Sequence, residues 1–247
     1  MTHNDYWKIR AQRYNNLDWA KKPQLLQELI KFCVLEPDDV VLDAGCGTGI
    51  VAMAIKDMVL KVAAMDSSPD MLAQISFSER NIIPLCYDLQ IPLPEFADSF
   101  NKVISRMVFH HLDDVDAGFK NCYNMLSEGG TFVIQEGIPP SEDPEVVAWY
   151  TKVMGMKETR NTITESMMRV YFNRHKFKNI ETKIVTDNNF SVLNWLRSSG
   201  QDPYKLKAIY LAHKNAPDNI KKVYDMKDGE EADILMNTKV LYIKGRK

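Results

Sequence analysis

A glycine-rich segment is the feature that most restricts how this chain can fold. Gly45, Gly47 and Gly49 follow an apolar run at residues 40–42 and precede a helical pattern at residues 50–55. Glycines at such a junction permit a tight turn and let a ligand approach the backbone closely. The following helix would present unpaired N–H groups and the positive end of its dipole to that ligand. The segment therefore predicts a nucleotide-like ligand at a strand-to-helix turn.

Further apolar runs alternate with helical patterns along the first half of the chain. Alternation of this kind predicts an α/β fold with a mostly parallel sheet covered by helices on both faces. A helical stretch over residues 143–177 follows, and two more apolar runs come late in the sequence. The predicted strands cover residues 40–42, 61–65, 82–87, 102–105, 131–135, 179–185 and 239–243.

Composition limits the kinds of binding partner and the cell compartment that we expect for this chain. The formal net charge of the 247 residues is -2 and the basic residues are scattered, so we expect no affinity for nucleic acid or anionic lipid. The 4 cysteines form no C-x-x-C pair and no His or Cys group has zinc spacing, which predicts reduced thiols and no metal site. The N-terminus lacks an apolar signal core and no apolar run is long enough for a membrane span. We expect a cytoplasmic protein.

Two acidic residues refine the nature of the ligand. Asp66 ends the second predicted strand about 20 residues after the glycine segment, the spacing at which a carboxylate reaches ribose hydroxyls in such folds. Asp88 follows the third predicted strand, where it can accept a hydrogen bond from an adenine amino group. Ile50 stands where a dinucleotide-binding segment would have its third glycine, which disfavours NAD.

With the glycine segment, Asp66 and Asp88 in this order along the chain, the sequence resembles the class I S-adenosylmethionine (SAM) dependent methyltransferases. The resemblance covers about residues 37–138 and is greatest with the small-molecule enzymes related to ubiquinone/menaquinone and phosphobase methyltransferases. It implies a Rossmann-like, seven-stranded, mostly parallel sheet with an antiparallel last strand and helical lid additions. It also implies methyl transfer from SAM, with S-adenosylhomocysteine as product. The segments that carry the resemblance are residues 41–49, 65–72, 87–94, 105–112 and 126–130.

The resemblance also assigns roles to individual residues. His111 would orient or deprotonate the acceptor together with Tyr14; the residues leave open that His111 only packs on the cofactor or caps the next helix. The residues expected to contact SAM are Tyr6, Tyr14, Asp43, Gly45, Cys46, Gly47, Asp66, Ser67, Met71, Asp88, Leu89 and Arg106. The candidates for the substrate pocket are His110, Glu136, Arg160, Tyr171 and Trp195.

The chain is expected to divide into three parts. Residues 1–36 would form an N-terminal helical lid, residues 37–140 the SAM-binding core, and residues 141–247 the rest of the core. That last part would carry helical substrate-cap insertions at about 142–176 and 188–231, with Phe190, Trp195, Leu196 and Tyr204 on the inner face of the second insertion.

Several functions remain open at this point. The neutral charge and the predicted cap favour a small-molecule acceptor that is methylated on O, N, S or C, with the enzyme a monomer or homodimer. The alternative is a protein or RNA methyltransferase. An NAD-dependent oxidoreductase and a non-catalytic SAM-binding protein are weaker alternatives.

Overall fold

The computed structural model describes residues 11, 22–75, 80–197, 199 and 201–247. Its sheet contains seven long strands and the two-residue strand β7 at the edge of β8. The strands are β1 (Val40–Ala44), β2 (Lys61–Asp66), β3 (Ile82–Cys86), β4 (Phe100–Arg106), β5 (Leu126–Ile138), β6 (Lys178–Ser191), β7 (Lys227–Asp228) and β8 (Ile234–Arg246). Cys46 and Gly47, which were expected to contact the cofactor, lie in the turn after β1.

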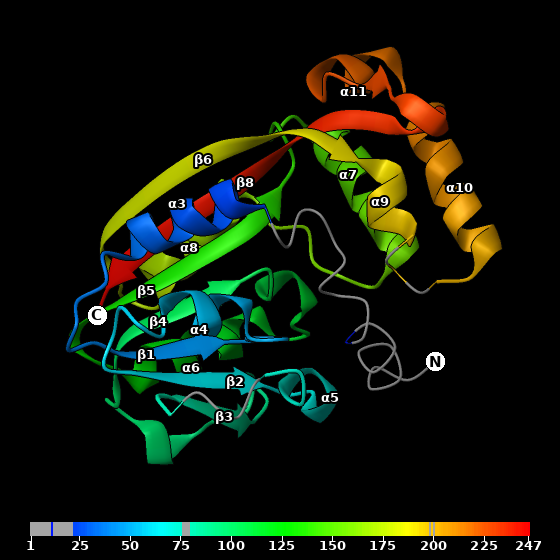
Figure 1. Ribbon diagram of the computed structural model, residues 1–247. Helices are drawn as coiled ribbons and strands as arrows, with labels where there is room; N and C mark the ends of the chain where they lie inside the picture. Colours follow the sequence, from blue (N-terminus) through cyan, green and yellow to red (C-terminus); the bar gives the residue numbers. More distant parts are fainter. Residues whose placement is uncertain (1–10, 12–21, 76–79, 198, 200) are drawn as a thin grey trace.

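The strand order confirms the predicted fold class. It runs β3-β2-β1-β4-β5-β8-β6, and the pairs among the first five strands are parallel. The last long strand, β8, lies antiparallel between β5 and β6. The carboxyl ends of β1 and β2 point toward α5 and the side of the molecule where α7, α9 and α10 gather (Figure 1). Ligand sites of open α/β sheets lie at this edge.

Helices cover both faces of the sheet, each over its own apolar cluster. Leu29 and Ile55 belong to the cluster under α3 and α4, whereas Phe119 and Phe172 belong to the one under α6 and α8. All four side chains are fully buried, so the sheet is covered on both sides as predicted. The helices are α3 (Pro23–Cys33), α4 (Ile50–Ile55), α5 (Pro69–Leu72), α6 (Val115–Met125) and α8 (Glu165–Arg174), with 3-10 turns at Pro94–Phe96 and Phe109–His111.

A separate group of helices forms a cap at the carboxyl ends of β5 and β6 and the amino end of the antiparallel β8 (Figure 1). The cap consists of α7 (Pro144–Lys157), α9 (Val192–Arg197), α10 (Pro203–Lys214) and α11 (Asp218–Val223), and the 3-10 turn Glu230–Ala232 leads back to the sheet. It has an apolar cluster of its own that includes Tyr150, Trp195 and Tyr224. Because this core is distinct from those of the sheet, the cap helices pack mainly on one another.

Local sequence explains where several elements begin. Asp143 and Asp114 accept hydrogen bonds from the first free N–H groups of α7 and α6, and Ser68 does the same for α5. β5 begins at Leu126, ahead of its apolar run at residues 131–135, and includes Gly129 at a φ of 76°, close to a register shift in the pairing with β4. The fifth strand is therefore longer than its apolar run.

Candidate functional site

A cavity of about 540 Å³ lies at the carboxyl ends of β1, β2, β3 and β4, and we call it the loop cavity. That volume is within the range of small-molecule and cofactor sites. Ten of the residues predicted to contact a cofactor line it: Asp43, Gly45, Cys46, Gly47, Asp66, Ser67, Met71, Asp88, Leu89 and Arg106. Most of the residues expected to contact the cofactor therefore gather around this one cavity.

The glycine segment forms a tight turn along one wall of the loop cavity. Gly45, Gly47 and Gly49 have φ angles of 74°, 55° and 80°, which side chains other than hydrogen disfavour. The N–H groups of Gly45 and Cys46 both donate to the carbonyl of Met65, at 2.8 Å, and so attach the turn to the end of β2. A Cβ on Gly47 would meet no atom within 4 Å, so this residue presents bare backbone to the cavity.

Asp66 connects the glycine turn to the following helix. Its carboxylate accepts from the Gly47 N–H at 2.8 Å and from the Ser68 N–H at 2.9 Å. The side chain is half-buried and lines the loop cavity at the end of β2. Held in this way, it can accept further hydrogen bonds from a pair of vicinal hydroxyls.

Asp43 is the buried acid beneath the same turn. Burial raises the pKa of its carboxyl to about 7, although a hydrogen bond from the Ala52 N–H at 3.0 Å and the positive charge of Arg106 both act to lower that pKa. Arg106 is itself buried and donates from Nε to Gln135 at 3.0 Å. An acid and a guanidinium therefore share the floor of the loop cavity.

The far wall of the loop cavity is apolar apart from one carboxylate. Met71 and Leu89 are buried there, at 2% and 5% exposure. Asp88 accepts from the backbone N–H of Gln90 at 2.9 Å, which fixes the turn after β3. Flat aromatic ligands suit such a wall, with the acid able to accept from an exocyclic amine.

A second cavity, of about 120 Å³, lies between the sheet and the cap, and we call it the cap cavity. Side chains of α7, α9 and the turn after β4 surround it, including His110, Lys157, Arg160 and Trp195. Met107 and His111 line the cap cavity and the loop cavity alike. The two cavities therefore meet at His111, in the 3-10 turn that follows β4.

Glu136 holds this 3-10 turn from below. One carboxylate oxygen accepts from the N–H groups of Val108 and Phe109, at 2.9 and 2.7 Å, and the other contacts Nδ1 of His110 at 2.6 Å. The residue is fully buried, and burial raises its carboxyl pKa to about 7. Glu136 was expected at the pocket rim; the structure places it outside both cavity linings, where it supports the histidines.

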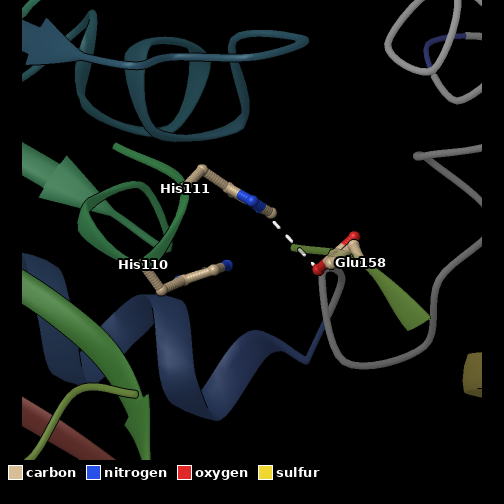
Figure 2. Close-up of side chains that lie close together, drawn as sticks. All are labelled: His110, His111 and Glu158. Carbon is tan, nitrogen blue, oxygen red and sulfur yellow. Dashed lines mark ion pairs between the residues drawn. The ribbon is translucent and has the colours of Figure 1, made fainter. Parts of the chain in front are cut away.

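His111 extends toward Glu158, as Figure 2 shows. The distance between His111 Nε2 and Glu158 Oε1 is 4.0 Å, and the guanidinium of Arg160 lies 3.6 Å from the same oxygen. The rings of His110 and His111 lie side by side, with centroids 4.0 Å apart. All four residues line the cap cavity, so it has a polar end at the histidines and an aromatic end at Trp195.

Comparison with known proteins identifies the family. The model of the methyltransferase domain family matches residues 42–134, the segment that contains the glycine turn, Asp66, Asp88 and His111. Residues 42–134 therefore form a domain of the class I SAM-dependent methyltransferase type. This matched segment builds the loop cavity, whereas the cap lies beyond it.

The similar proteins differ in how much of the chain they cover. An uncharacterized methyltransferase of Schizosaccharomyces pombe is 23% identical over 66% of this chain and 63% of its own length. A ubiquinone biosynthesis O-methyltransferase of Xanthomonas campestris is 26% identical over 54% of this chain and 59% of its own length. The chain thus spans less than two thirds of the curated relatives it matches.

Similarity of fold extends further than similarity of sequence. The crystal structure of the YcgJ protein from Bacillus subtilis superposes with a TM-score of 0.79 at 20% identity, and the match covers 91% of this chain and 98% of that one. Among the described residues, every helix is too short or too polar to cross a lipid bilayer.

The remaining predicted residues have different positions. Tyr171 stacks on Phe119 at a centroid distance of 5.1 Å, over the sheet and outside the linings of both cavities. Tyr6 and Tyr14 lie outside the described residues. The expectation for Tyr204 is wrong: it is 85% exposed, because α10 buries Ile209 and His213 instead.

Two charged residues of the cap cavity were not predicted from the sequence. Lys157 ends α7 and is 1% exposed, with its Nζ 4.2 Å from the ring centroid of Trp195. Glu158 caps the same helix, next to His111. No local pattern marks either residue, since both reach the cap cavity only through the packing of α7 against α9 and the sheet.

Proposed function

We propose that this chain transfers the methyl group of SAM to a small-molecule acceptor. The observation that carries the proposal is the position of His111, which lines the loop cavity and the cap cavity together with Met107. A methyl donor in one cavity and an acceptor in the other would have their reacting groups at this junction. Close, aligned placement of two reactants accounts for much of the catalysis of a displacement reaction.

The residues of the loop cavity fit SAM by their chemistry. Asp66 offers carboxylate oxygens to ribose hydroxyls, and the bare backbone at Gly47 allows close approach of the ligand. Met71 and Leu89 supply an apolar wall for adenine, with Asp88 as acceptor for its amino group. When bound there, SAM supplies an electrophilic methyl group on a sulfonium.

His111 is the residue we assign to the acceptor. Its imidazole has an intrinsic affinity for protons near neutrality and lies at the junction of the cavities, with a side-chain exposure of 15%. We propose that it contacts the nucleophilic atom of the acceptor and promotes loss of its proton. Tyr14 remains the proposed second member of this pair, and Tyr6 a proposed cofactor contact.

The cap cavity supports a small acceptor over a macromolecule. Its volume is about 120 Å³, and helices of the cap and strands of the sheet surround it. The pocket combines Trp195 and Phe190 with the charged groups of Lys157, Glu158 and Arg160. An acceptor with a small apolar body and a polar reacting end matches this lining. The relative from ubiquinone biosynthesis also takes its name from a small molecule.

Two measurements test the proposal. Calorimetry should detect binding of SAM and S-adenosylhomocysteine but not of NAD, and selective binding of NAD would refute it. Incubation with methyl-labelled SAM and pools of small hydroxyl- and amine-bearing compounds should give labelled small products. Label found only in added RNA or protein would instead support the macromolecular alternative.

The role of His111 has its own test. The His111→Ala variant should bind S-adenosylhomocysteine as the wild type does, while transfer slows by about 10²–10⁴-fold. His175→Ala is a matched control, because His175 also faces a carboxylate, that of Asp116 at 3.1 Å, but lines neither cavity. Unchanged turnover in His111→Ala would remove His111 from the reaction.

A further inference from the structure

Three potential metal ligands converge in the cap cavity. One atom each from His110, His111 and Glu158 lies within 4.8 Å of the other two, and among the described residues no other group of three does so. Figure 2 shows both imidazole rings extending toward the carboxylate. His110 is buried and the other two are half-buried, so the group is set into the wall of the cavity.

The three ligand atoms lie slightly farther apart than around a bound zinc ion. Zinc binds imidazole nitrogen and carboxylate oxygen at about 2.0–2.2 Å, so two ligands of a tetrahedral ion stand about 3.3–3.6 Å apart. His111 Nε2 and Glu158 Oε1 are 4.0 Å apart, and the three atoms all lie within 4.8 Å of one another. An ion bound between them would therefore draw the side chains slightly closer together.

His110 has the outer partner that a metal-binding histidine usually has. Its Nδ1 lies 2.6 Å from Glu136, whose other oxygen is held by the N–H groups of Val108 and Phe109. A carboxylate at Nδ1 favours the tautomer with the proton on that nitrogen, which leaves the lone pair on Nε2 for a cation. Orientation of His110 would explain why Glu136 is buried beneath this turn without lining either cavity.

The segment that carries Glu158 is tied to the histidine turn. The Asn161 N–H donates to the carbonyl of His110 at 2.8 Å, and the Asn161 side-chain amide donates to the carbonyl of Leu112 at 2.6 Å. These bonds join two parts of the chain that are far apart in sequence. The carboxylate is thereby held opposite the two imidazoles without any metal.

We propose that His110, His111 and Glu158 bind one divalent transition-metal ion in the cap cavity. Two imidazoles and a carboxylate favour zinc or a similar first-row ion over Mg²⁺ and Ca²⁺, which prefer oxygen ligands alone. Three protein ligands leave at least one position of the ion open, as in catalytic metal sites. The open position would face the cavity that we assign to the acceptor.

Arg160 is a cation beside these ligands. Its guanidinium lies 3.6 Å from Glu158 Oε1 and also close enough to Glu136 to lower the pKa of that carboxyl. Two carboxylates therefore stand near one guanidinium and two imidazoles. Since a carboxylate has two oxygens, Glu158 can bind an ion through one while Arg160 contacts the other.

The ion would define the chemistry of the acceptor. A hydroxyl bound to a divalent cation loses its proton far more readily than in water, which makes it a nucleophile near neutral pH. The acceptor would then be an oxygen nucleophile, and His111 would promote loss of its proton to water through the ion that it holds, rather than by direct contact. This role depends on the proposed methyl transfer, whereas metal binding itself does not.

Calorimetry with Zn²⁺ on the full chain, stripped of metal with a chelator and dialysed, tests the site. We expect one equivalent to bind, and we expect His110→Ala, His111→Ala and Glu158→Gln each to abolish or strongly weaken that binding. Glu136→Gln should weaken it by about 10–100-fold through the orientation of His110. His175→Ala should bind as the wild type does. Absence of binding at micromolar Zn²⁺, or equal binding by all variants, would overturn the site.

Two further measurements keep the result clear if a variant is unstable. Binding of Co²⁺ to the unmodified chain should change the visible spectrum of the ion as nitrogen ligands replace water, and an unchanged spectrum would count against the site. Binding of S-adenosylhomocysteine, measured on the same samples, reports on the loop cavity. If the unmodified chain binds S-adenosylhomocysteine but not Zn²⁺, only the metal site is overturned, whereas failure of the unmodified chain to bind S-adenosylhomocysteine contradicts the proposed function.

Discussion

Two glycines of the same turn are expected to respond differently to alanine. Gly47→Ala adds a methyl group that meets no protein atom within 4 Å and extends toward the loop cavity. Gly45→Ala adds one that would lie 2.4 Å from Cγ2 of Val108. Both residues have positive φ angles, so both substitutions carry the same backbone strain.

The expected magnitudes follow from these contacts. Left-handed strain costs about 1–2 kcal/mol, which for a chain of this size lowers the melting temperature of Gly47→Ala by about 2–8 °C. Gly45→Ala adds an overpacking cost of about 1–3 kcal/mol and should lose about 2–5 kcal/mol in total. In Gly47→Ala the methyl group instead meets the ligand, and a similar overpacking cost weakens binding of S-adenosylhomocysteine by about 10–100-fold.

Thermal unfolding and calorimetry with S-adenosylhomocysteine measure the two effects separately. Gly155→Ala in α7 is the control, since its methyl group also meets no atom within 4 Å and its φ is not positive. It should stabilise the chain by about 0.5–1 kcal/mol and leave binding unchanged. If Gly47→Ala binds the ligand as tightly as the wild type, the ligand does not approach the backbone of the turn and our placement of the cofactor is wrong.

Three further predictions concern the buried acid, the cap and a helix end. Burial raises the pKa of Asp43 to about 7, so above about pH 4 the folded chain keeps a proton that the unfolded chain has lost, and the stability that this proton contributes is lost as pH rises from about 4 to 7. The free energy of unfolding in urea of Asp43→Asn, relative to the wild type, should therefore increase by up to about 3 kcal/mol between pH 5 and pH 8. A constant difference between the two proteins would contradict the raised pKa. Trp195→Ala should lower the free energy of unfolding by about 3–5 kcal/mol and enlarge the cap cavity. In labelled-methyl assays the variant should therefore prefer bulkier acceptors more than the wild type does. An unchanged preference would place the acceptor elsewhere. Asp114→Ala removes the acceptor for the Ala117 N–H at the start of α6 and should lower the free energy of unfolding by about 1 kcal/mol, with ligand binding unaffected.

The loop cavity was predictable because its determinants are local. The glycine turn, Asp66 and Asp88 each follow a strand within a few residues, and parallel strands bring such positions to one edge of the sheet. The sequence pattern therefore identified both the elements and the residues that line the cavity. Met71 and Leu89 were found in the same way, since each lies just after one of these strands.

The cap cavity was less predictable because its residues meet through tertiary packing. Glu136 lies two residues before the end of β5, whose length depends on pairing with β8 rather than on the apolar run at residues 131–135. Glu158 reaches His111 through the direction in which the chain leaves α7. Tyr204 was expected on an inner face, but the burial of Ile209 and His213 sets the rotation of α10 about its axis. Periodicity within a segment carries no information about these relations.

The separate apolar core of the cap has a consequence for how this protein could change over evolutionary time. Tyr150, Trp195, Ile209 and Tyr224 pack with one another, and none belongs to the two clusters beneath the sheet. Substitutions in the cap can therefore accumulate without disturbing the half of the molecule that builds the loop cavity. Exchange of the cap helices between related proteins is therefore a practical route to new acceptor preferences, while the residues of the loop cavity stay unchanged.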